Sequence, residues 1–360
     1  MNDGDRAEML LNNHGMDDLR RNEATGFPDL HLGRVVSQEK GYYRVMCAEK
    51  EIIAKISGKM RFQSKRSSDY PAVGDFVMLD RPHDNSGHAI IHHILSRRSL
   101  FIRKAVGGQS DAQVVAANID MVFICMSLNE DFNLRRLERY LALTWESGAT
   151  PVVVLTKADL CEDVVRKVHA VNSVALGVDL IVTSAMDEDS YKDIADTIQP
   201  GSTVALIGSS GVGKSTLINC LLHDERLPKK AIREKDGRGR HTTTRRELFQ
   251  LPNGGIVIDT PGMREIGMWE STEGIDKTFS DVETFLGNCR FSDCTHTSEP
   301  GCAIHEALEQ GELSHKRWAS YRKLMVETAY QDNKNTYLVE KEKKFKDIAK
   351  LNKQGIRKQP

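Results

Sequence analysis

The chain has 360 residues, a formal net charge of −1 and 39% hydrophobic residues, which is enough sequence for two or three domains that each bury a core. No stretch approaches the roughly 18 consecutive apolar residues of a transmembrane helix, and the first residues lack the basic and then apolar pattern of a signal peptide. We therefore expect a cytoplasmic protein without membrane partners. Seven cysteines, three of them within residues 289–302, favour free thiols and a metal site over a disulfide framework.

The near-neutral net charge hides two basic regions. Residues 33–104 hold 14 Lys and Arg against 7 Asp and Glu, and residues 316–360 hold 13 against 5. Two separate clusters of this kind indicate contacts with a polyanion such as nucleic acid. A single basic cluster is more often a solvated surface, so charge alone leaves both interpretations open.

The first predicted domain follows a polar, acidic stretch, residues 1–31, which we expect to be a flexible tail. Residues 32–100 contain five short β-branched or aromatic runs separated by turn residues. This pattern predicts a small closed β-barrel of the OB type, a fold that often binds RNA. The predicted strands cover residues 34–36, 42–47, 51–56, 75–79 and 88–94.

Two features of this barrel have alternative interpretations. Residues 59–66, KMRFQSKR, suit an RNA-binding loop, and an exposed solvated loop is an equal alternative. His92 and His93 have no Cys or His at ligand spacing nearby, so we expect barrel residues rather than metal ligands.

The second predicted domain, residues 101–274, follows a linker expected over residues 97–106. An almost continuous apolar run at residues 119–126 predicts a buried strand, and residues 134–147 have the periodicity of an amphipathic helix. Strand and helix patterns then alternate to residue 262. This alternation predicts a mostly parallel sheet covered by helices.

A phosphate-binding loop lies in this domain and matches G-x-x-x-x-G-K-[S/T] in full. A β-branched run, residues 203–207, precedes it and a helical pattern follows it, which is the context that the motif requires. Backbone N–H groups of the loop would hold the phosphates, Lys214 would reach the β and γ oxygens, and Ser215 would offer a hydroxyl to Mg²⁺. The loop residues are Gly208, Ser209, Ser210, Gly211, Val212, Gly213, Lys214, Ser215 and Thr216.

Two other strand ends predict a guanine pocket. Thr156, Lys157 and Asp159 follow one strand, and Ser184 and Ala185 follow another. The Asp159 carboxylate can accept from N1–H and the exocyclic amine of guanine, a pattern that adenine does not present. Lys157 can cover the base with its aliphatic stem, and the Ser184–Ala185 backbone can donate to the guanine O6. A T-K-x-D motif alone is weak, but together with the phosphate loop it becomes specific.

In this order the motifs resemble the circularly permuted GTPases of the YjeQ/RsgA type, which act on the small ribosomal subunit. Ordinary GTPases have the phosphate loop first and the guanine motifs last, whereas here Thr156 to Ala185 precede Gly208. The resemblance covers about residues 32–330. It implies a multidomain α/β protein with an N-terminal OB-type barrel, a central circularly permuted P-loop GTPase domain and a C-terminal α-helical zinc-binding domain. It departs at Thr156, where GTPases generally have Asn; the Thr156 hydroxyl can still brace the phosphate loop.

The resemblance also implies two switch segments. Residues 229–246 hold eight Lys and Arg against two acids, a composition typical of a mobile segment. Within it the resemblance assigns Thr243 to Mg²⁺ and the γ-phosphate. After a strand at residues 255–258, Asp259 would hold Mg²⁺ through water and the Gly262 N–H would contact the γ-phosphate. The magnesium set is therefore Ser215, Thr243 and Asp259.

Met263 occupies the position where many GTPases have the glutamine that orients the attacking water. A thioether cannot orient water, and the resemblance makes His241 the candidate substitute. A histidine that contacts RNA or solvent is the alternative. We expect Lys214, Thr243 and His241 to be the catalytic residues.

Three cysteines and a histidine, Cys289, Cys294, His296 and Cys302, lie within 14 residues in the third predicted domain, residues 275–340. Three thiolates and an imidazole can close tetrahedrally on Zn²⁺ with no open position, which indicates a structural zinc site. The spacing also matches the resembled family, and His305 is a reserve ligand.

Aromatic residues Trp318 and Tyr321 lie among cations in a helical pattern further on, where they suit either RNA contact or the core of the small domain. Residues 341–360 are lysine-rich, and we expect a basic tail that becomes ordered on RNA.

The sequence thus predicts a GTPase that binds GTP and GDP, uses Mg²⁺ and one structural Zn²⁺, and acts as a monomer on the small ribosomal subunit and its rRNA late in subunit maturation. GTP hydrolysis, slow alone and stimulated by the ribosome, would gate release. The alternatives are an RNA-binding zinc protein that binds GTP without turnover and a phosphate-loop kinase or ATPase. Asp159 argues against the second alternative, because it reads guanine.

Overall fold

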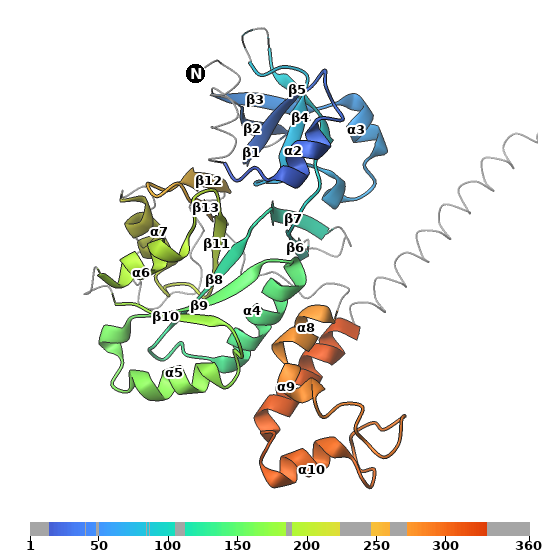
Figure 1. Cartoon of the computed structure of the whole chain (residues 1–360), viewed down its shortest axis with the longest axis vertical. Helices are drawn as coiled ribbons and strands as arrows, with labels where there is room; N and C mark the ends of the chain where they lie inside the picture. Colours follow the sequence, from blue (N-terminus) through green and yellow to red (C-terminus); the bar gives the residue numbers. More distant parts are fainter. Residues whose placement is uncertain are drawn as a thin grey trace, which may run out of the picture. The chain divides into compact units, whose positions relative to one another are not determined.

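The computed structural model describes residues 14–39, 41–47, 50–83, 85, 87–104, 112–184, 189–223, 246–259 and 272–329. The described residues form two compact units, one made by residues 14–104 and 112–259 and the other by residues 272–329. Figure 1 shows the helices and strands of both units.

The first unit begins with a closed five-stranded barrel, as predicted from its short alternating strands. The strands are β1 (His31–Glu39), β2 (Tyr42–Met46), β3 (Glu51–Ile56), β4 (Phe76–Leu79) and β5 (Ala89–Ile94). They pair in the order β1-β2-β3-β5-β4, and β4 returns to β1. The β3–β5 pair is parallel and the others are antiparallel, which closes the sheet around a buried apolar core. This is the OB-type barrel expected from the sequence.

Residues 59–66 were predicted as a loop, and the structure differs. Helix α3 (Gly58–Gln63) occupies most of this segment, and a short 3₁₀ helix, η1 (Ser67–Asp69), follows it. The Ser57 side chain caps α3 by accepting from the Met60 N–H, and this cap starts a helix in a sequence without strong apolar periodicity.

The N-terminal segment also differs from the tail predicted over residues 1–31. Its described part contains helix α2 (Asp18–Ala24), whose Asp17 cap accepts from the Arg20 N–H. Met16, Ala24, Phe27 and Leu30 pack on a small apolar cluster of the barrel. Of these four residues only Ala24 belongs to α2, so the helix itself shows no apolar periodicity in the sequence.

A mostly parallel sheet follows the barrel, with strand order β10-β9-β8-β11-β13-β12. Only β12 (Glu247–Gln250) is antiparallel to its neighbour. The parallel strands are β8 (Met121–Ser127), β9 (Thr150–Thr156), β10 (Asp179–Val182), β11 (Thr203–Ile207) and β13 (Ile256–Asp259). The helices of this part are α4 (Leu134–Ser147), α5 (Val164–Asn172), α6 (Asp189–Thr197) and α7 (Lys214–Leu222), with the 3₁₀ turn η2 (Ala158–Leu160). Apolar side chains of α6 and α7 pack on the sheet in one core, as the strand and helix alternation predicted.

Part of the predicted linker, residues 97–106, is instead a strand. β6 (Leu100–Lys104) pairs with β7 (Ala112–Ala117) in a separate antiparallel sheet. The barrel and the parallel sheet also join directly, because Ser37 of β1 pairs with Glu247 of β12. The barrel strands and the strands of the parallel sheet therefore belong to one continuous sheet, separate from the β6–β7 pair. No local pattern in the sequence predicts the long-range pairing of β1 with β12.

The second unit is helical. It contains α8 (Glu273–Thr278), α9 (Ser280–Glu283), α10 (Ala303–Gln310) and a helical segment over residues 315–329. Tyr321 and Leu324 are buried, and Tyr321 packs edge-on against Phe279. Tyr321 therefore belongs to the core of this unit rather than to an exposed RNA surface. Among all described helices, none is long and apolar enough to cross a membrane.

Candidate functional site

The phosphate-binding loop connects the end of β11 to the start of α7 at one edge of the parallel sheet. Gly208, Gly211 and Gly213 all have positive φ, at 143°, 77° and 104°. A Cβ atom at Gly208 would lie 2.3 Å from the Cys125 carbonyl oxygen of β8, so glycine is required there by space as well as by conformation. At Gly211 and Gly213 a Cβ atom would meet no described atom within 4 Å. Those two glycines therefore present backbone on the open side of the loop, where a phosphate can approach.

Two side chains hold this loop from inside the domain. The Lys214 ammonium donates to the carbonyls of Gly208 and Ser209, at 2.8 and 2.6 Å. The buried Thr156 hydroxyl, at the end of β9, donates to the Val212 carbonyl at 2.6 Å. Thr156 occupies the position where GTPases generally have Asn, and its hydrogen bond to Val212 braces the phosphate loop.

A third contact to the loop comes from Arg136 of α4, which the sequence analysis did not identify. Its guanidinium contacts the Ser209 hydroxyl and pairs with Asp131, at 2.9 Å to the carboxylate and 2.8 Å to the carbonyl. Arg136 and Ser209 are 73 positions apart, so only the fold brings them together.

The predicted guanine residues meet at the ends of β9 and β10, which are neighbouring parallel strands. The Ser184 hydroxyl donates to the Asp159 carboxylate at 2.8 Å. Lys157 has a left-handed backbone conformation, with φ of 60°, which turns the chain sharply at the strand end, and the Ala158 N–H donates to the Thr183 carbonyl at 3.1 Å. The two segments are thereby tied side by side. Ala185 lies outside the described residues.

Asp259 ends β13, the parallel neighbour of β11, and so lies at the same edge of the sheet as the phosphate loop. Burial raises the pKa of its carboxyl, Lys214 opposes this shift and Glu247 adds to it. A carboxylate here can support Mg²⁺ beside Ser215, the second residue of α7. Four other predicted positions, His241, Thr243, Gly262 and Met263, lie outside the described residues.

A second site lies in the helical unit, where Cys289, Cys294, His296 and Cys302 place their ligand atoms within 4.8 Å of one another. The His296 Nδ1 atom is 3.5 Å from the sulfurs of Cys289 and Cys302, which are 4.0 Å apart. A tetrahedral Zn²⁺ with bonds of about 2.3 Å to sulfur needs ligand atoms about 3.5 to 4 Å apart. The donor set and its spacing therefore fit a zinc ion. His305 is not part of this cluster among the described residues.

These two sites define the class of protein: a P-loop GTPase fold in circularly permuted order, between an OB-type barrel and a unit with a Cys₃His cluster. The profile of the RsgA GTPase family matches residues 94–269. The chain is 47% identical to small ribosomal subunit biogenesis GTPase RsgA 2 of Lactiplantibacillus plantarum over 83% of this chain and 84% of the relative. The chain belongs to the RsgA GTPase family, which confirms the resemblance drawn from its motifs, and the family implies GTP hydrolysis.

Other relatives agree with this assignment. Small ribosomal subunit biogenesis GTPase RsgA 1 of Oceanobacillus iheyensis is 45% identical over 90% of this chain and 93% of the relative. Among solved structures, YjeQ from Thermotoga maritima has a TM-score of 0.63 and 28% identity, covering 83% of this chain and 99% of that one. The structure of YloQ, described as a circularly permuted GTPase, has a TM-score of 0.59 and 26% identity, covering 84% of this chain and 96% of that one.

Proposed function

We propose that this protein is a GTPase that binds the small ribosomal subunit and acts in its late maturation, with GTP hydrolysis gating its release. The observation that carries the proposal is the meeting of the phosphate loop, Asp259 and the two guanine segments at one edge of the sheet. The partner is proposed from relatives named as small ribosomal subunit biogenesis GTPases. In this proposal the protein acts in the cytoplasm as a monomer.

The residues have separate roles in this proposal. Asp159, with Ser184 and Ala185, selects guanine, and Lys157 covers the base. The loop from Gly208 to Thr216 binds the phosphates, with Lys214 on the β and γ oxygens. Mg²⁺, which would neutralise phosphate charge, would be held by Ser215, Thr243 and Asp259, and the Gly262 N–H would contact the γ-phosphate.

His241 positions the attacking water in this proposal, because Met263 cannot. The free enzyme would then turn over slowly, and the bound small subunit would accelerate it by positioning His241. A displacement of about one ångström of a catalytic group can cost on the order of a hundredfold in rate, so positioning alone is a sufficient cause. His241→Ala should keep GTP binding and lose most of the stimulated turnover.

Zinc is the metal that we propose for the Cys₃His cluster, with a structural role, because all four ligands are protein groups. The cluster lies in the helical unit, which comes after Asp259 in the chain. A change at the γ-phosphate can therefore reach the zinc unit through a short connection, residues 260–271, and alter its hold on the ribosome.

The test is turnover of GTP and of ATP, measured with and without purified small subunits. We expect hydrolysis of GTP, little of ATP, and a higher rate with subunits. GTP binding without turnover under both conditions would instead support an RNA-binding zinc protein that uses GTP as a ligand.

Base selection has its own test. Asp159→Asn should shift preference from guanine to xanthine nucleotides, because the amide can donate to the xanthine 2-oxo group where the carboxylate could only accept. Equilibrium titration with GDP and XDP measures this shift. Unchanged GDP affinity would contradict the assignment of Asp159.

A further inference from the structure

A row of four residues crosses the continuous sheet from the barrel to Asp259. Arg44 of β2 lies opposite Ser37 of β1, and Ser37 lies opposite Glu247 of β12. Glu247 in turn lies opposite Asp259, the last residue of β13. All three pairings are antiparallel, and residues directly opposite each other in such a pair have their side chains on the same face of the sheet. We call these four residues the cross-strand row.

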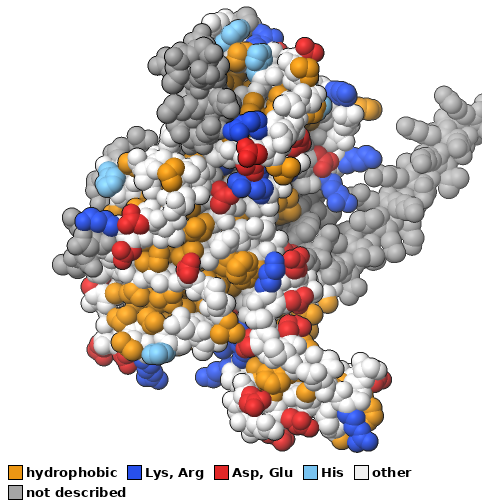
Figure 2. Space-filling view, in the orientation of Figure 1, with side chains coloured by type: hydrophobic (Ala, Val, Ile, Leu, Met, Phe, Trp, Pro, Cys, Tyr) orange, Lys and Arg blue, Asp and Glu red, His pale blue; other side chains and the backbone are white. Residues whose placement is uncertain are grey.

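An ion pair joins the barrel end of the cross-strand row to β12. The Arg44 guanidinium donates to the Glu247 carboxylate at 3.0 Å, and it also donates to Glu51 of β3. Ser37 stands between Arg44 and Glu247 and is small and buried, so it leaves room for Arg44 to reach across β1. Figure 2 shows basic and acidic side chains next to one another where the barrel meets the parallel sheet. A charge of the barrel is thereby placed beside the strand that borders Asp259.

Glu247 and Asp259 are two carboxylates at directly opposite positions. Like charges in such a pair repel, because the Cβ atoms of cross-strand partners are about 5 Å apart. Folding by itself gives no reason for this arrangement. Glu247 would be attracted to a divalent cation beside Asp259 about twice as strongly as it is repelled by the Asp259 carboxylate at a similar distance. The arrangement of the two carboxylates therefore suits the Mg²⁺ role of Asp259.

We propose that Glu247 is a positioning residue for Mg²⁺ at the GTP site, and that Arg44 of the barrel sets how strongly the Glu247 charge acts on the ion. Glu247 adds attraction for the cation at the end of β13, and Arg44 neutralises part of that attraction through the ion pair. The barrel thereby regulates the affinity of the GTP site for Mg²⁺. This inference rests on the Mg²⁺ role proposed above for Ser215 and Asp259, and it does not depend on hydrolysis.

The test is the affinity of the full, zinc-loaded chain for a fluorescent GDP, measured over a range of free Mg²⁺ concentrations. Glu247→Gln keeps the size of the side chain and removes its charge. The Mg²⁺ concentration that gives half of the gain in GDP affinity should therefore rise by about 3- to 10-fold, the effect of one nearby charge on a divalent ion in screened solvent. Arg44→Gln leaves the Glu247 charge uncompensated and should lower that concentration by about 2- to 5-fold. Arg44→Lys keeps the charge and should match the parent.

Measurement in EDTA separates this role from a structural one. Without Mg²⁺, Glu247→Gln should bind GDP like the parent or slightly more tightly, because loss of a carboxylate can only reduce repulsion of the phosphates. A purely structural role of Glu247 would instead weaken GDP binding both with and without Mg²⁺.

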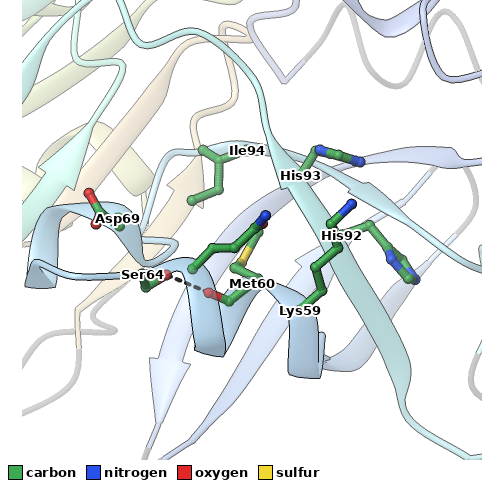
Figure 3. A pocket seen from close by; sticks show the side chains of 8 residues that line it. Lys59, Met60, Ser64, Asp69, His92, His93 and Ile94 are labelled. Carbon is green, nitrogen blue, oxygen red and sulfur yellow. Dashed lines mark hydrogen bonds between the residues drawn. The ribbon is translucent and has the colours of Figure 1, made fainter.

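Lys59→Gln and Arg81→Gln are matched controls in the same barrel. Lys59 is an exposed cation on α3 that lines a hollow together with His92 and His93, outside the cross-strand row (Figure 3). Arg81 forms an ion pair with Asp80 at 2.7 Å, also outside the row. Both variants should show the Mg²⁺ dependence of the parent.

A parent-like Mg²⁺ dependence of Glu247→Gln would overturn the role of Glu247. Shifts of the same sign in Glu247→Gln and Arg44→Gln would overturn the role of Arg44, and weaker GDP binding of Glu247→Gln in EDTA would leave Glu247 only a structural role. A parent whose GDP affinity does not respond to Mg²⁺ would overturn this proposal together with the magnesium assignment. Absence of GTP turnover in the parent, with the expected Mg²⁺ shifts in the variants, would support this proposal and contradict only the proposed function.

Discussion

Thr156→Val tests whether a hydroxyl at the end of β9 stabilises the phosphate loop for nucleotide binding. Valine has nearly the shape of threonine but lacks the donor, so the substitution removes the 2.6 Å hydrogen bond to the Val212 carbonyl and little else. Thr156 is 7% exposed, and water therefore has little access to replace the lost donor.

The expected magnitude follows from that burial. A neutral hydrogen bond contributes about 0.5 to 1.5 kcal/mol, and a buried acceptor left without a donor costs about 1 to 3 kcal/mol. If about 1 to 2 kcal/mol of this is lost from the ordered loop, nucleotide affinity falls by about 5- to 30-fold. GTP and GDP should be affected equally, because Thr156 braces the loop and is not assigned to the γ-phosphate.

Calorimetric titration with GDP and with a non-hydrolysable GTP analogue measures the effect. Thr156→Ser keeps the hydroxyl and should bind nearly as the parent does. Thr144→Val, which removes another buried threonine hydroxyl that donates to a carbonyl at 2.8 Å in α4, should reduce stability without a change in nucleotide affinity. Parent-like affinity of Thr156→Val would refute the bracing role, and equal weakening by serine and valine would assign the effect to side-chain shape instead.

Three further predictions concern other parts of the molecule. Cys294→Ala should have a lower zinc content, and its helical unit should unfold at a lower temperature, while GDP binding persists. Metal analysis and calorimetry measure these effects, and full zinc content in the variant would contradict the ligand set. Arg136→Ala should weaken GDP binding several-fold in titration, whereas Arg135→Ala, which removes a pair with Glu138 on the same helix, should not; equal effects would indicate general loss of α4. Burial, and then Arg34, lower the pKa of His14 to about 4, below its usual value near 6.5, so the folded state binds fewer protons and stability falls as pH drops from about 6.5 toward 4. Between pH 7 and pH 5, His14 should lower the free energy of unfolding, measured in urea, by about 2 kcal/mol. This loss should be absent in His14→Gln. The same loss in that variant would refute the assignment to His14.

The sequence by itself determined the features that depend on short stretches of chain. The phosphate loop needs glycine where φ is positive and where a neighbouring carbonyl is close, and such requirements appear directly as a motif. Four metal ligands within 14 residues are likewise a local pattern. The barrel and the parallel sheet were predicted from strand length and alternation, since each strand carries its own period. Permuted motif order was visible because it is a property of the chain itself.

Tertiary structure decided what joins distant stretches. Arg34 of β1 is fully buried and donates to the Thr203 hydroxyl at the start of β11, 169 positions away. In the sequence it is one more cation of a basic region. The pairing of β1 with β12, the contact of Arg136 with Ser209 and the packing of α2 on the barrel have the same origin. Each depends on which surfaces meet after the chain has folded, and a one-dimensional pattern contains the period of an element but not the identity of its neighbour.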